Sequence, residues 1–110
     1  MLSLVLSRAA SGLLRALLQR SGDQCDRILL SEVLSVAWQS LTFVGERHRL
    51  RLRIRGPGAR QLVGRLIDGL EEAEFAIPGQ IVADIALAGA PARDHDGSFG
   101  LEIEALTVAE

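Results

Sequence analysis

Lysine is absent from this 110-residue chain, and its twelve basic residues are all arginine. Cysteine occurs once, at Cys25, so no disulfide can form within the chain, and this favours a reducing compartment such as the cytoplasm. No apolar run approaches the ~20 residues that a membrane-spanning helix requires. The remaining composition, 48% hydrophobic and 24% charged, is that of an ordinary globular protein and predicts a single soluble domain.

Charge of each sign gathers in one part of the chain. Residues 1–65 carry eleven arginines against four acidic residues, a net charge of +7, whereas residues 66–110 carry one arginine against ten acidic residues, −9. The net charge of −2 would repel a polyanion at long range, so nucleic acid is an unfavoured partner. Two parts of one fold that attract each other explain the segregation more simply.

The N-terminal residues have the pattern of an amphipathic helix. Within residues 2–20, apolar side chains recur at helical spacing, and Ser21 and Gly22 supply a stop. The apolar positions are Leu2, Leu6, Ala9, Leu13 and Leu17. We expect residues 1–22 to form a helix that covers the core of a single ββαββ domain, residues 23–110. The segment has no acidic residue and is rich in arginine and serine, so mitochondrial targeting is the alternative.

Strand and helix patterns follow one another along the rest of the chain. We expect strands at 33–44, 47–55, 80–88 and 100–108, a hairpin turn at Gly45 and Glu46, a helix at 59–75, and a loop at 90–99. The order αββαββ predicts an α+β two-layer sandwich, in which a four-stranded, mainly antiparallel sheet carries both helices on one face.

Five arginines alternate with His48 and three apolar residues through residues 47–55. This period of two places Leu50, Leu52 and Ile54 on one face of a strand and the arginines on the other. If the last strand lies beside this one, Glu102 and Glu104 are placed to pair with Arg51, Arg53 and Arg55 across the sheet. We therefore interpret the arginines chiefly as a device that fixes strand register.

An anion site is the first alternative use of these arginines. The stretch RGPGAR passes from strand to helix through a glycine-rich turn, where backbone N–H groups can hold an anion. Its candidate residues are Arg53, Arg55, Gly56, Gly58 and Arg60, within a wider basic segment at 47–60. The stretch lacks a phosphate-loop pattern, and the polar strand faces offer no aromatic platform for bases.

Catalysis is the second alternative, and the sequence gives it little support. His95 lies between two aspartates in DHDG, and Cys25 is a possible nucleophile, but neither belongs to a recognisable catalytic pattern. DHDG begins like a calcium loop, yet the further oxygen ligands are missing. We expect no metal, no cofactor and no catalytic residue.

The strand expected at 33–44 has apolar residues on both of its faces. One helix layer can cover only one face, so the other needs its own cover, which is either the N-terminal helix folded over it or another subunit. The candidate interface residues are Leu34, Val36, Trp38, Leu41 and Phe43. We therefore expect a non-catalytic domain that self-associates, most simply as a homodimer, or binds a protein partner.

Overall fold

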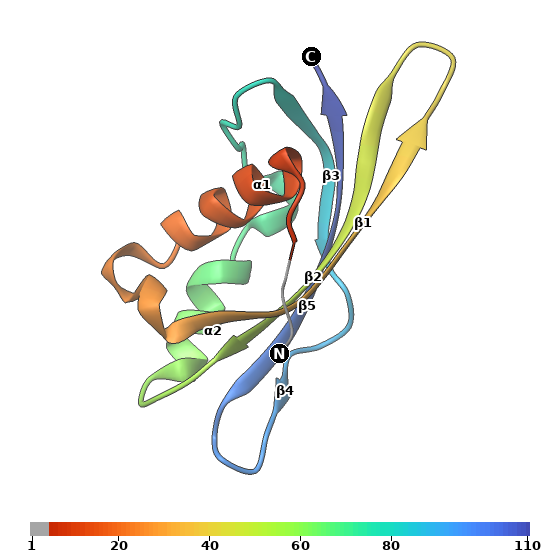
Figure 1. The fold of residues 1–110 in the computed structure, drawn as a ribbon. Coiled ribbons are helices and arrows are strands. Elements are labelled where there is room, and N and C mark those ends of the chain that lie inside the picture. The colour runs from red at the N-terminus through yellow and green to blue at the C-terminus, as the bar shows by residue number, and fades with distance from the viewer. Residues whose placement is uncertain (1–4) are drawn as a thin grey trace.

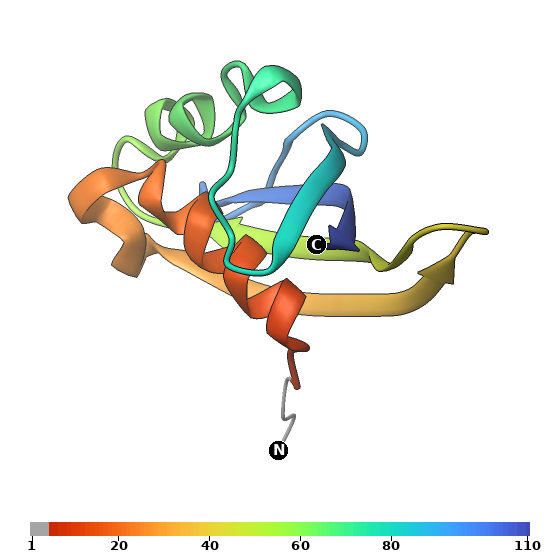
Figure 2. The ribbon, with the colours of Figure 1, turned by 90° about the horizontal axis from the view of Figure 1, so that it is seen from above.

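A computed structural model describes residues 5–110 as an α+β fold, in which helices cover one face of an antiparallel five-stranded sheet (Figures 1 and 2). The helices are α1 (Arg8–Gln19) and α2 (Ala59–Ile67), with short 3-10 helices η1 (Gly22–Arg27) and η2 (Leu70–Glu72). The strands are β1 (Ile28–Gln39), β2 (Val44–Ile54), β3 (Gln80–Leu87), β4 (Ala92–Arg93) and β5 (Phe99–Ala109). Within these residues no helix is both long and apolar enough to cross a bilayer.

The sheet has the strand order β1-β2-β5-β3, with β4 paired to β5, and all neighbouring strands are antiparallel. The prediction that the last strand lies beside the arginine-rich strand is confirmed, because β5 pairs with β2 along its length. The prediction of four strands was wrong by one. Ala92 and Arg93 form β4 against Phe99 and Gly100, inside the expected loop, and two residues are too short to show any alternation.

The core lies between the helices and the inner face of the sheet. Apolar residues of β2 and β5 alternate inward, as period two requires, and meet the apolar stripes of α1 and α2. The fully buried members are Leu13, Leu17, Leu50, Leu52, Ile54, Leu62, Leu66 and Ile103.

Helix α1 begins later than the sequence pattern suggested. Ser7 caps it, because the Ser7 hydroxyl accepts a hydrogen bond from the Ala10 amide at 3.1 Å, and the helix starts at Arg8. Ala9, Leu13 and Leu17 are buried on its inner side, Leu6 is half-buried, and Leu2 lies outside the described residues.

Strand β1 begins at Ile28, five residues earlier than expected. A register shift between Leu30 and Glu32 interrupts the alternation, so Ile28, Leu30 and Val33 face inward without obeying a simple period of two. Because of this bulge, the residue pattern does not reveal the first part of the strand.

The turn between β1 and β2 was placed wrongly at Gly45 and Glu46. Ser40 and Phe43 close it, with the Ser40 amide donating to the Phe43 carbonyl at 2.9 Å and the Phe43 amide donating to the Ser40 hydroxyl at 3.1 Å. Gly45 lies within β2 instead. A Cβ there would stand 2.0 Å from the Thr107 carbonyl oxygen, so glycine is needed for the close approach of β5.

Helix α2 is also shorter than expected, ending at Ile67 instead of continuing to residue 75. Gly69 adopts φ 63°, which ends the helix, and the chain resumes as η2. Arg20 holds this end, because its Nε donates to the Leu66 carbonyl at 3.0 Å and another guanidinium nitrogen donates to the Asp68 carbonyl. The arginine that follows α1 thus joins the C-terminal ends of both helices.

Candidate interaction surface

The sheet face that points away from the helices, called the outer face below, has a different chemistry on each strand. Strand register places an apolar column on β1, the arginines on β2 and two glutamates on β5. The columns are Leu34, Val36 and Trp38; Arg47, Arg49, Arg51 and Arg53; and Glu102 and Glu104 followed by Leu106 and Val108. Neither helix covers this face (Figure 2).

Most of the large exposed apolar side chains lie on the outer face or on the β1–β2 turn. Leu34 and Val36 are 50% and 53% exposed on β1, while Leu41 and Phe43 are 104% and 52% exposed at the turn. We define the apolar surface as Leu34, Val36, Trp38, Leu41, Phe43, Val44 and Ile81. The β1–β2 hairpin that carries most of it extends beyond the helices (Figure 1).

The sequence-predicted interface residues thus separate into two groups. Leu34, Val36 and Trp38 share the outer face, where Trp38 is half-buried, and Leu41 and Phe43 project at the turn. Val44 and Ile81 were missed, because Val44 was taken as a strand end and Ile81 lies on the opposite edge strand. Only the strand order β1-β2-β5-β3 brings Ile81 to the same face.

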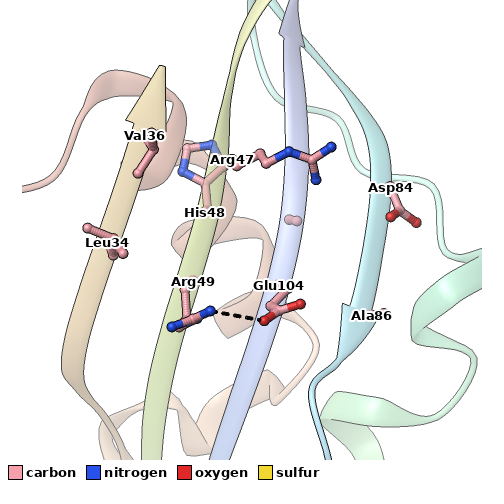
Figure 3. A pocket seen from close by; sticks show the side chains of 9 residues that line it. Leu34, Val36, Arg47, His48, Arg49, Asp84, Ala86 and Glu104 are labelled. Carbon is pink, nitrogen blue, oxygen red and sulfur yellow. Dashed lines mark ion pairs between the residues drawn. The ribbon is translucent and has the colours of Figure 1, made fainter. Parts of the chain in front are cut away.

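A shallow hollow of about 380 Å³ crosses the outer face and is shown in Figure 3. Leu34 and Val36 line it from β1, and Asp84 and Ala86 line it from β3. Arg47 extends across β5 toward β3, which carries Asp84 (Figure 3). No ion pair of Arg47 or Asp84 is found within residues 5–110.

The other arginines of β2 are engaged by carboxylates. Arg49 pairs with Glu104 at 3.5 Å, and the register sets these two residues directly opposite each other. Arg51 bridges Glu102 of β5 and Glu32 of β1, each at 3.1 Å. The cross-strand pairing expected for Arg51 is therefore present, and its second partner, on β1, was not foreseen.

Arg53 does not reach the glutamates of β5 as expected. It lies opposite Gly100, and its guanidinium instead meets Asp94 at 3.3 Å and Asp96 at 3.1 Å in the loop before β5. Hydrogen bonds from Ser98, with the nearby Arg53, lower the pKa of Asp96 to about 2. Within the DHDG segment, Asp96 therefore joins the loop to Arg53 on the sheet.

The glycine-rich turn forms a second candidate site. Gly56 and Gly58 have φ of 89° and 75°, which favours glycine, and Arg27 donates from Nε to the Arg55 carbonyl at 2.9 Å. Arg60 lies over the Phe99 ring at 5.8 Å. A hollow of about 600 Å³ is lined by Gly56, Gly58 and Arg60, together with Arg93 and Asp96. Arg53 points to Asp96 and Arg55 is exposed, so the candidate anion residues do not all converge on one hollow.

A buried histidine joins three strands on the inner face. His48 is 3% exposed, and its ring nitrogens lie 2.8 Å from the Ser35 hydroxyl on β1 and 2.8 Å from the Thr107 hydroxyl on β5. Burial lowers the pKa of His48, and the nearby Glu46 opposes this in part. The sequence indicated the burial of His48, because the period of two in this strand puts His48 on the same face as Leu50 and Leu52.

The residues proposed for catalysis lie at exposed positions. Cys25 is on η1, and His95 is in the loop between β4 and β5. Within residues 5–110 no group of three or more histidine, cysteine, aspartate or glutamate side chains could hold a metal ion. No protein-family model and no curated protein matches the chain.

Proposed function

We propose that this chain is a non-catalytic module that self-associates through the apolar surface, with binding of another protein at the same surface as the related possibility. The gathering of exposed apolar side chains on the outer face and the β1–β2 turn carries the proposal. Of the large hydrophobic residues exposed within residues 5–110, Val5 is the one outside the β1–β2 hairpin and the outer face.

The exposed apolar residues of the β1–β2 hairpin form one contiguous patch, which supports a binding surface and not a set of isolated exposed side chains. Single exposed apolar residues are common on monomers, whereas a contiguous apolar patch usually marks an interaction site. Leu34, Val36 and Trp38 follow one another on one column of β1, and the hydrophobic turn continues from its end. Burial of apolar area at ~25 cal/mol per Å² is the driving force available to such a surface.

The polar part of the outer face supports specificity. Arg49 and Arg51 are already neutralised by Glu104 and Glu102, so they offer little net field to a polyanion. Arg47 and Asp84 lie on either side of Leu106 in one row, without an ion pair in residues 5–110. A protein partner can meet such a mixed rim with hydrogen bonds around an apolar centre.

Light scattering of the full chain between 1 and 100 µM, roughly the range in which weak specific complexes assemble, tests the proposal. We expect the mass to rise toward twice that of the monomer, and Val36→Ser to shift the transition to higher concentration. Val5→Ser is the matched control, because Val5 is 85% exposed and lies outside the apolar surface. A monomeric mass throughout, or equal effects of both variants, would refute self-association through this surface.

Anion binding at the glycine-rich turn is the second candidate function. It is supported by the hollow in which Gly56, Gly58 and Arg60 face Arg93. Asp96 on the same rim and the placement of Arg60 over Phe99 weaken it. Titration with single-stranded RNA at two salt concentrations tests it, since phosphate contact must weaken steeply as salt rises.

A further inference from the structure

Strand β1 forms one edge of the sheet. β1 lies at one end of the order β1-β2-β5-β3, so one side of its backbone has no partner strand within residues 5–110. An unpaired strand edge is a template for pairing with another chain, and proteins normally protect it with charges, proline or bulges. Whether β1 carries these features decides how readily its edge can pair with another chain.

The protective features of β1 are confined to its first part. The bulge between Leu30 and Glu32 and the one charge of the strand, Glu32, both lie there. Residues 33–39 contain no charge, no proline and no glycine. The opposite edge differs, because β3 has a bulge between Val82 and Asp84 and a carboxylate within the strand. The unprotected edge is thus the last seven residues of β1.

Building on the self-association proposed above, we infer that two copies of the chain pair edge to edge through β1, antiparallel, around a two-fold axis at Val36. This axis is the centre of residues 33–39, between the bulge and the strand end. The two four-strand paths, each β1-β2-β5-β3, then join into one continuous sheet.

The side chains of β1 fit this axis. Val36 meets Val36 of the second copy, and Leu34 meets Trp38 of the second copy on the outer face, so one apolar band crosses the junction. On the inner face, Ser35 lies opposite Ala37 of the second copy. Glu32 falls opposite Ser40, so the strand's charge does not face its own copy. The edge is complementary to itself, which is what a closed two-fold contact requires.

Disulfide trapping tests this register. In a Cys25→Ser background, which removes the exposed native thiol, Val36→Cys places two thiols directly opposite each other, with Cβ atoms about 5 Å apart. Leu34→Cys is the matched control, since two copies of residue 34 would stand about 13 Å apart along the strands. Ile81→Cys controls for face-to-face packing, because it lies on the outer face of β3.

We expect mild oxidation to give at least about tenfold more covalent dimer with Val36→Cys than with Leu34→Cys or Ile81→Cys, because only directly opposed positions meet disulfide geometry. A mixture of Leu34→Cys and Trp38→Cys chains should also cross-link. A dimeric mass by light scattering, with cross-linking at residue 34 or 81 but not at 36, would refute edge pairing through β1 and leave self-association standing. A strictly monomeric mass would overturn the self-association on which it rests.

Discussion

Removing the ion pair between Arg51 and Glu102 should lower the free energy of unfolding only slightly. The coupling free energy between these two residues should still be measurable. Arg51 Nη2 lies 3.1 Å from Glu102 Oε1, with the two side chains 54% and 26% exposed. Exposed ion pairs and cross-strand pairs contribute about 0.2–1 kcal/mol, and this partial exposure favours a value near 0.5 kcal/mol. Arg51 keeps Glu32 as a second partner, which limits the loss in Glu102→Gln.

A double-mutant cycle measures this coupling. Urea unfolding of the wild type, Arg51→Gln, Glu102→Gln and the double variant, at one protein concentration, gives four free energies of unfolding whose cross-difference is the coupling. At 1 M salt the coupling should fall toward zero, because the Debye length is then about 3 Å. The Arg53 and Glu102 cycle is the control, since Arg53 contacts Asp96 and not Glu102. Coupling in the control cycle and none for Arg51 would refute the observed register.

Three further changes test the packing of the fold. Leu13→Ala in α1 should lower the free energy of unfolding by about 2–5 kcal/mol, because Leu13 is fully buried; urea unfolding measures this. Gly45→Ala should cost about 1–3 kcal/mol, since its Cβ would overlap the Thr107 carbonyl, and a melting temperature equal to wild type would exclude that close approach. The pKa of His48 in the folded state lies below 6.5, so the unfolded state binds the proton first as pH falls. The free energy of unfolding should therefore decrease as pH falls from 6.5 toward that lowered pKa. Urea unfolding across this range should show the slope in wild type and in His95→Gln, but not in His48→Gln.

Local periodicity sufficed for the centre of the fold. The alternation in β2 placed Leu50, Leu52 and Ile54 in the core and the arginines outside, and the complementary glutamates placed β5 beside β2. These features depend on neighbours one or two residues away, or on charge complementarity visible in the sequence.

Features that depend on long-range backbone geometry were not predictable. The bulge in β1 interrupts the period of two, and Gly45 resembles a turn residue although it serves the close approach of β5. β4 exists only because the loop returns to β5. In the same way, Arg53 meets Asp96 through a loop whose path no periodicity encodes.

The candidate surface was predictable in part. Apolar residues on both faces of β1 indicated that Leu34, Val36 and Trp38 needed a cover, and the structure leaves them on the outer face. Ile81 joins the surface from β3, and the row of Arg47 and Asp84 appears only once β5 is placed between β2 and β3. These residues share one face because of the strand order, which the sequence does not reveal.

Fluorescence of Trp38 tests self-association through the apolar surface most directly. Trp38 is the one tryptophan of the chain, and it lies half-buried on the outer face of β1. Concentrating the protein should shift its emission to shorter wavelength as the indole leaves water, with a midpoint that matches the rise in mass. Emission that stays constant while the mass doubles would show that the copies meet elsewhere, and constant emission at a constant monomeric mass would contradict self-association altogether.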